Sequence, residues 1–104
     1  MKLMHITMEF QYADMIESIL DEHDVCDYVR YPMMLGKDRQ GKHHGSKVFP
    51  GNLSVLQALV HDEDVDSLLE DLRAFQIERN AHRHLRAVVV AVEAGIVDDG
   101  EEAS

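Results

Sequence analysis

The chain has 104 residues, of which 45% are hydrophobic, 29% charged and only 6% aromatic, with 20 acidic residues against 10 lysines and arginines. A chain of this length forms one small domain, which buries about 65% of its unfolded surface. The formal net charge of −10 excludes general nucleic-acid binding, because an acidic protein repels a polyanion. No apolar run reaches the roughly 20 residues of a membrane span and no signal-peptide pattern is present, so we expect a cytoplasmic protein without membrane insertion.

The single cysteine excludes an intrachain disulfide. No base that would activate the thiol can be identified in the sequence around Cys26. Because free cysteines are among the most buried residue types, we expect Cys26 to be a small buried hydrophobe.

Two different periodicities follow one another at the start of the chain. Apolar and polar residues alternate over residues 3–9, which predicts a strand with Met4, Ile6 and Met8 on one face. Over residues 12–24 the apolar positions recur at helical spacing, with acids between them. A helix is therefore expected after the first strand.

The next segment changes from strand-like to loop-like composition. Residues 25–35 are rich in valine and tyrosine, which predicts a second strand, and Pro32 either makes it an edge strand or ends its regular pairing early. Residues 36–51 contain four glycines, a proline and almost no apolar side chain, which predicts a long irregular loop. Loops of this length are uncommon in small domains and are generally functional or disordered. We expect this one to be functional.

The second half of the chain predicts another strand, helix and strand. Residues 53–60 form the third predicted strand, and the acids at 62–64 are placed to cap the following helix. That helix begins at Val65 and continues at helical spacing to about residue 79. A run of valines and alanines over residues 85–92 predicts the fourth strand.

The resulting order is β-α-β-β-α-β, and right-handed crossovers favour an α+β, ferredoxin-like antiparallel sheet with both helices on one face. We expect this domain to span residues 1–96, and residues 97–104 to be a disordered acidic tail. The fourth strand is apolar on both faces, although the helices cover only one. Another copy of the chain is the most economical cover, so we expect a homo-oligomer with its sheets packed inward.

Positive charge is expected to gather at one end of this negative domain. In the predicted topology, the first β-to-α turn, the loop 36–51 and the connection before the fourth strand emerge at the same end of the sheet. The loop carries four lysines and arginines against one acid, and residues 79–86 add three arginines and no acid. Glycine N–H groups and lysine ammonium groups suit phosphate or carboxylate. The predicted anion-binding residues are Gly36, Lys37, Gly41, Lys42, Lys47, Arg79, Arg83 and Arg86.

Histidine is the second unusual feature, with seven in the chain. Imidazole is a common ligand for Zn, Cu, Ni and Co, although adjacent histidines seldom bind one ion and no Cys or Glu stands at a recognised spacing. A divalent metal site is therefore the less favoured alternative, with the candidate ligands His43, His44, His82 and His84. Structural roles are expected for the other three, His5, His23 and His61.

No motif in the sequence is typical of an enzyme. The serines lie in no nucleophile-elbow context, and most acids are in helix-surface or capping positions. We therefore expect a binding protein without catalytic residues.

Length, element order and the Gly- and Lys-rich loop together resemble the P-II signalling superfamily, in particular the small P-II-like proteins homologous to nitrogen regulatory protein P-II. The resemblance covers about residues 1–96 and is carried by the loop 36–51, by Phe49-Pro50-Gly51-Asn52 and by the fourth strand up to Val92-Glu93. It implies a homotrimer whose sheets line the centre, with an adenine nucleotide or bicarbonate bound in clefts between subunits. It also implies a mobile loop that contacts a target protein, such as a membrane transporter.

The connection before the fourth strand departs from the P-II pattern. In P-II proteins it is rich in glycine and lysine and helps to bind adenine nucleotides, whereas residues 79–86 here read Arg-Asn-Ala-His-Arg-His-Leu-Arg. The loop also lacks the tyrosine that is uridylylated in many P-II proteins. The alternative from another class is a metal-binding tolerance protein, efflux-associated or similar to the CutA type, which shares the trimeric ferredoxin-like architecture and would use the four candidate histidines.

Overall fold

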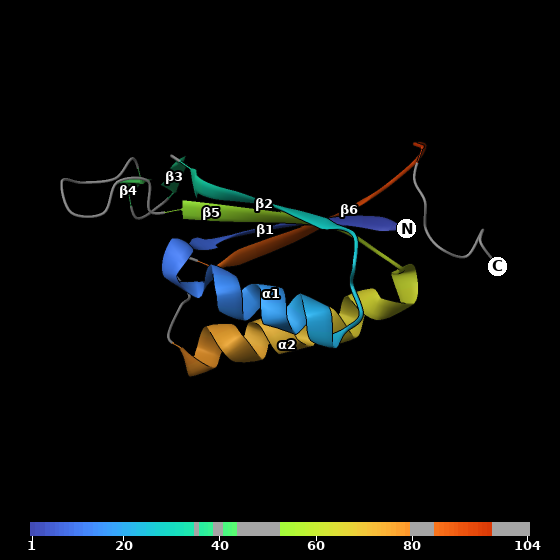
Figure 1. Ribbon diagram of the computed structural model, residues 1–104, viewed down its shortest axis with the longest axis horizontal. Helices are drawn as coiled ribbons and strands as arrows, with labels where there is room; N and C mark the ends of the chain where they lie inside the picture. Colours follow the sequence, from blue (N-terminus) through green and yellow to red (C-terminus); the bar gives the residue numbers. More distant parts are fainter. Residues whose placement is uncertain (35, 39–40, 44–52, 80–84, 97–104) are drawn as a thin grey trace.

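The computed structural model describes residues 1–34, 36–38, 41–43, 53–79 and 85–96. In chain order, these residues form β1 (Lys2–Glu9), the short 3-10 helix η1 (Phe10–Tyr12), α1 (Ala13–Glu22), β2 (Tyr28–Met34), β3 (Gly36–Asp38), β4 (Gly41–His43), β5 (Leu53–Val60), η2 (Asp62–Asp64), α2 (Val65–Glu78) and β6 (Arg86–Ala91). The main sheet is antiparallel with the strand order β2-β5-β1-β6, and both helices lie on one of its faces (Figure 1). The predicted ferredoxin-like fold is confirmed.

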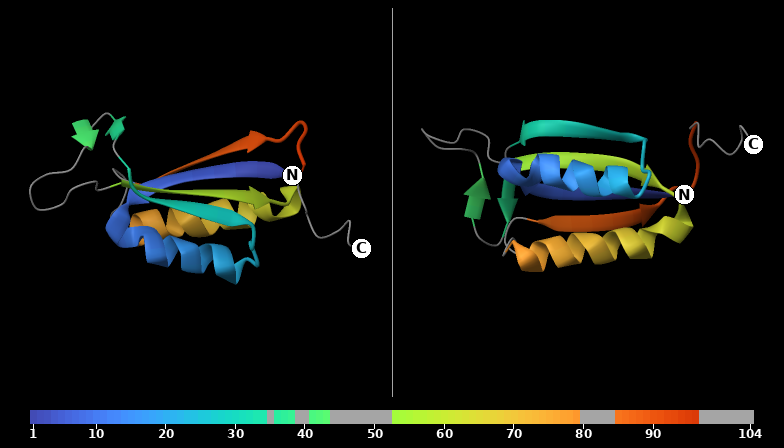
Figure 2. Two further views of the ribbon diagram at one scale, coloured as in Figure 1. Left: turned by 45° about the horizontal axis from the view of Figure 1, so that its top comes forward. Right: turned by 60° about the horizontal axis from the view of Figure 1, so that its bottom comes forward.

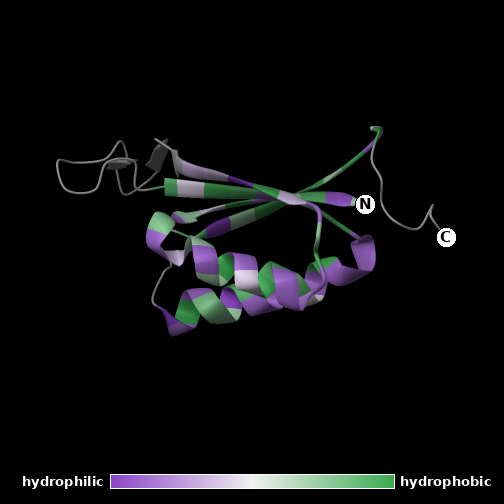
Figure 3. Ribbon diagram, viewed as in Figure 1, coloured by the Kyte–Doolittle hydropathy of each residue, from purple (hydrophilic) through white to green (hydrophobic). Residues whose placement is uncertain are grey.

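The hydrophobic core lies between the helices and the sheet. Met4, Ile6 and Met8 of β1 are fully buried, as their alternation predicted. Both helices alternate hydrophobic and hydrophilic residues along their length (Figure 3), and the buried ones complete the core: Ala13, Ile16 and Leu20 from α1, and Leu68, Leu72 and Phe75 from α2. Each large aliphatic side chain buried in this way contributes roughly 1.5–3 kcal/mol.

The other face of the sheet, here called the open face, is not covered by a helix. Four large apolar side chains on it are 43–53% exposed: Val29, Tyr31, Val88 and Val90. On β6, Ala87 and Val89 point the opposite way and pack against the core. The prediction that this strand is apolar on both faces is therefore confirmed.

Part of the segment 36–51 is more regular than expected. Strands β3 and β4 pair antiparallel, with Lys37 opposite Lys42 and Asp38 opposite Gly41. The prediction of an irregular loop was wrong for these residues, because strands of three residues are too short to leave a periodic pattern in the sequence. The rest of this segment lies outside the described residues.

Cys26 is exposed, so the prediction of a buried cysteine was wrong. Its thiol lies in the connection between α1 and β2 and donates to the Asp24 carbonyl oxygen at 3.5 Å. In this connection it is Val25, only 6% exposed, that packs into the core. Asp24 has φ 59°, a left-handed conformation that turns the chain away from the helix.

The acids before α2 act differently from the predicted caps. Within the described residues, the N-cap Asp64 makes no side-chain capping hydrogen bond. Asp62 instead accepts a hydrogen bond from the N-terminal ammonium group at 2.6 Å, which lowers the pKa of the Asp62 carboxyl. The charges of both acids still lie at the positive end of the helix dipole.

Neither α1 nor α2, the two α-helices within the described ranges, is long and apolar enough to cross a membrane.

Candidate functional site

The described parts of the segments predicted to converge lie at one end of the molecule. The turn from β1 to α1, the β3–β4 pair, the end of α2 and the start of β6 share the end opposite the N-terminus (Figures 1 and 2). This arrangement follows from the topology, since each of these segments joins elements at the same end of the sheet. We call it the basic end.

The glycine and lysine candidates that the structure describes lie in the β3–β4 pair. Lys37 and Lys42 are direct partners across it, and Gly36 is the partner of His43. Gly41 begins β4 opposite Asp38. The pairing therefore brings the two lysine positions together. Lys47 lies outside the described residues.

Arg79 lies at the end of α2, where its backbone N–H donates to the Phe75 carbonyl oxygen at 2.9 Å. Its guanidinium carbon lies 5.8 Å from the centre of the Phe75 ring, within the range of a cation–π contact. This contact holds an exposed arginine at the basic end. Arg83 lies in the undescribed segment that follows.

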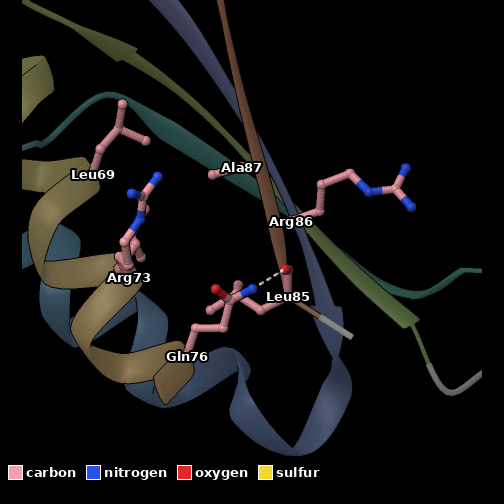
Figure 4. A pocket seen from close by; sticks show the side chains of 7 residues that line it. Leu69, Arg73, Gln76, Leu85, Arg86 and Ala87 are labelled. Carbon is pink, nitrogen blue, oxygen red and sulfur yellow. Dashed lines mark hydrogen bonds between the residues drawn. The ribbon is translucent and has the colours of Figure 1, made fainter. Parts of the chain in front are cut away.

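Arg86 is the first residue of β6 and pairs with Thr7 of β1. By strand alternation it shares the open face with Val88 and Val90. Its side chain is exposed and points away from α2 (Figure 4). Arg86 thus places a positive charge where the open face meets the basic end.

Arg30 of β2 has a different environment. Its guanidinium donates to Asp14 at 2.8 Å and to Glu17 at 2.7 Å, and these hydrogen bonds raise the pKa of Arg30. Both carboxylates belong to α1, so this arginine ties β2 to the helix. Of the arginines in the described residues, the other three make no ion pair with a described carboxylate: Arg73, Arg79 and Arg86.

A hollow of about 240 Å³ lies between the C-terminal half of α2 and the start of β6 (Figure 4). Its lining residues are Leu69, Leu72, Arg73, Gln76, Leu85, Arg86 and Ala87. The Gln76 amide donates to the Leu85 carbonyl oxygen at 2.9 Å and so joins the two elements. Sequence reasoning did not identify this site, because Arg73 and Gln76 look like ordinary polar residues of an amphipathic helix. Their only signal was the helical spacing that places them beside Leu69 and Leu72.

The structure describes only one of the four candidate metal ligands, His43. His44, His82 and His84 lie outside the described residues, and His43 is placed only by its backbone pairing in β4. Across the part of the chain that is described, no three His, Cys, Asp or Glu side chains gather as a metal site would require. The histidine metal site stays a prediction.

Two of the other histidines have the structural roles expected of them. His23 Nε2 lies 2.6 Å from Asp71 Oδ2 and links the end of α1 to α2. His5 Nδ1 lies 3.2 Å from the Gln57 amide nitrogen and links β1 to β5. The structural role of His61 stays a prediction.

No protein-family model matches the sequence, and no curated protein matches it. Solved structures do match. CPII, a nitrogen regulatory PII-like protein from Thiomonas intermedia K12, bound to ADP, AMP and bicarbonate, is similar with a TM-score of 0.71 at 23% identity, over 90% of this chain and 93% of CPII. CPII bound to ADP and bicarbonate gives a TM-score of 0.66 at 26% identity, over 89% and 88% of the two chains.

A protein from Thermus thermophilus, proposed to be a PII-like signalling protein, has a TM-score of 0.61 at 18% identity, over 88% of this chain and 84% of its own. The resemblance to P-II-like proteins that the sequence indicated is therefore confirmed. In fold, the chain is similar to PII-like proteins over about nine-tenths of its length.

Proposed function

We propose that this chain is a P-II-like trimeric signalling protein that senses a small anion, an adenine nucleotide or bicarbonate, in clefts between its subunits. The observation that carries the proposal is the similarity, over 90% of the chain, to CPII bound to ADP, AMP and bicarbonate. The basic end supports it independently, since its segments include Lys37 and Lys42 of the β3–β4 pair, Arg79 at the end of α2 and Arg86 at the start of β6. The role is one of binding and not of catalysis.

The open face supports the assembly. Valine and tyrosine side chains that are 43–53% exposed on one sheet face form the kind of surface that another chain covers. With sheets packed inward, Arg86 lies at the rim of the covered face. A neighbouring copy then completes a cleft at the basic end.

The chemistry of this cleft suits anions. Guanidinium groups bind phosphate and carboxylate oxygens with two parallel hydrogen bonds, and lysines add point charges. We assign these contacts to Arg79, Arg83 and Arg86 from one side, and to Gly36, Lys37, Gly41, Lys42 and Lys47 from the other. Arg86 is the central contact, because it is unpaired within the described residues and lies at the proposed subunit boundary.

Signalling follows from the ligand's preference for one arrangement of residues 36–51. A ligand shifts a conformational equilibrium only as far as its affinities for the two states differ. Contacts from an anion to Lys37 and Lys42 would provide that difference. The favoured arrangement then binds or releases a target protein, for which a membrane transporter is the proposed example.

Calorimetric titration with ADP, AMP and bicarbonate tests this function. We expect Arg86→Ala to weaken anion binding at least about tenfold, because a charge-assisted hydrogen bond is lost. Arg73→Ala is the matched control, since this arginine lies on the helix side of β6, and it should change the affinity less than about twofold. The assembly mass should stay unchanged in both variants. An Arg86→Ala protein with wild-type affinity would contradict the proposed role of this residue.

Titration with Zn, Cu, Ni and Co separates the proposal from the metal-binding alternative. We expect no stoichiometric response to these ions. A stoichiometric response that His82→Ala abolishes would favour the metal-binding function instead.

A further inference from the structure

The hollow beside α2 lies on the helix side of β6, and Arg86, although it also lines the hollow, points its side chain away from α2 (Figure 4). Along β6, Leu85 and Ala87 face the helices, whereas Arg86 between them faces the other way. Figure 4 shows Arg73 and Arg86 on opposite sides of the strand. A ligand in the hollow would therefore contact side chains that the open face does not present.

Arg73 is directed to the hollow although an acid is available on its own helix. Glu70 lies three residues earlier, a spacing at which opposite charges on a helix commonly pair. No ion pair joins Arg73 to Glu70 or to any other carboxylate of the described residues. Its side chain extends along the hollow toward Leu69 and Ala87 (Figure 4). An arginine that pairs with no carboxylate of the described residues, in a chain with twice as many acids as lysines and arginines, is suited to an external anion.

Four of the seven residues that line the hollow are apolar: Leu69, Leu72, Leu85 and Ala87. Leu72 and Leu85 are 3% and 6% exposed, and they form the floor together with Leu69 and Ala87. The Gln76 amide group already donates to the Leu85 carbonyl oxygen, so its side-chain oxygen is left as an acceptor that does not attract an anion. Arg73 is therefore the polar anchor of this site.

Size and chemistry together define the ligand class. A volume of about 240 Å³ is below the roughly 300–1,000 Å³ typical of pockets for drug-sized molecules. We propose that the hollow binds a small carboxylate with a short hydrocarbon body. Arg73 pairs with the carboxylate, and the leucine side chains contact the hydrocarbon. This site does not depend on the proposed nucleotide cleft.

Butyrate is a suitable probe, and butyramide is its uncharged control. In NMR titrations of the full chain, butyrate should cause saturable shifts of the methyl resonances of Leu69, Leu72 and Leu85. Butyramide should bind at least about tenfold more weakly, because it cannot form the charge-assisted pair. Equal binding of the two probes, or no saturable shift at these leucines, would overturn the proposal.

Three variants locate the site. Arg73→Ala should weaken butyrate binding at least about tenfold, whereas Arg79→Ala, at an arginine that does not line the hollow, should weaken it less than about twofold. Ala87→Leu should also weaken it, because the larger side chain fills part of the hollow while every charge stays in place. Circular dichroism and thermal unfolding confirm that each variant is folded. Wild-type affinity in both Arg73→Ala and Ala87→Leu would overturn the assignment.

Discussion

At the residue scale, the contribution of Tyr28 to the stability of the fold depends on whether its hydroxyl is protonated. Its single hydroxyl proton is shared between two carboxylate acceptors, Asp21 Oδ1 at 3.1 Å and Glu17 Oε1 at 3.4 Å. Burial, followed by the hydrogen bond to Asp21, raises the pKa of Tyr28. Because the folded pKa is the higher one, the contribution to stability is fully present below the unfolded value of 10.0 and is lost as pH rises through the folded value.

Tyr28→Phe removes this hydroxyl. We expect the free energy of unfolding to fall by about 0.5–1.5 kcal/mol at neutral pH, as for the loss of a typical hydrogen bond. The difference between wild type and variant should shrink as the pH rises above about 10. Urea unfolding at neutral and alkaline pH measures both effects. A difference that is independent of pH would contradict the link to Tyr28 ionisation.

Ser54 of β5 is fully buried, and its hydroxyl has no hydrogen-bond partner among the described residues. Such a group costs roughly 1–3 kcal/mol in lost hydration. Ser54→Ala is therefore expected to raise the free energy of unfolding by about 1 kcal/mol. Ser67→Ala is the contrasting variant: this exposed hydroxyl donates to the Asp64 carbonyl oxygen at 3.3 Å, so its removal should lower the free energy of unfolding by up to about 1 kcal/mol. A destabilised Ser54→Ala protein in chemical unfolding would show that the hydroxyl does have a partner.

Residue patterns predicted the fold better than they predicted the hollow. The inward positions of β1 could be identified because strand alternation is local to the sequence. The position of the Arg73 guanidinium beside the hollow could not be identified, because it depends on where β6 lies beside α2. The amino-acid sequence of one segment does not show which distant segment it will contact in the fold.

At the scale of elements, α2 packs on the core through one row of buried apolar side chains. Leu68 is fully buried, whereas Ile77 on the same helix is 63% exposed. Leu68→Ala should lower the free energy of unfolding by about 2–5 kcal/mol, and Ile77→Ala by less than about 0.5 kcal/mol. Denaturant unfolding of the two variants measures this contrast. Equal losses would contradict the packing of α2 described above.

The six longer elements were predictable, whereas the short ones were not. Strands β1 and β5 and both helices begin or end within a residue or two of the expected positions, because their apolar periods are long enough to recognise. The β3–β4 pair is held by backbone pairing and not by apolar periodicity, so the composition of residues 36–51 predicted only a loop. The exposed position of Cys26 likewise depends on the path of the chain between α1 and β2, which residue-type statistics do not contain.

At the scale of the whole molecule, the apolar open face and the basic end are parts of one arrangement. The helices cover one sheet face, and β6 presents Val88 and Val90 on the other, where we propose that a second copy of the chain covers them. Sequence alone predicted this two-sided strand, because Val88 and Val90 alternate with Ala87 and Val89. The number of copies in the assembly is not encoded in any such local pattern.

Sedimentation equilibrium tests most directly whether sister chains cover the open face. We expect the wild type to have about three times the mass of one chain over a wide concentration range. Val88→Asp should dissociate it, because a charge buried without a partner is strongly unfavourable. Ile77→Asp, which adds the same charge on the helix side, should leave the mass unchanged. A wild-type chain that stays monomeric at high concentration would contradict both the assembly and the ligand clefts proposed between its subunits.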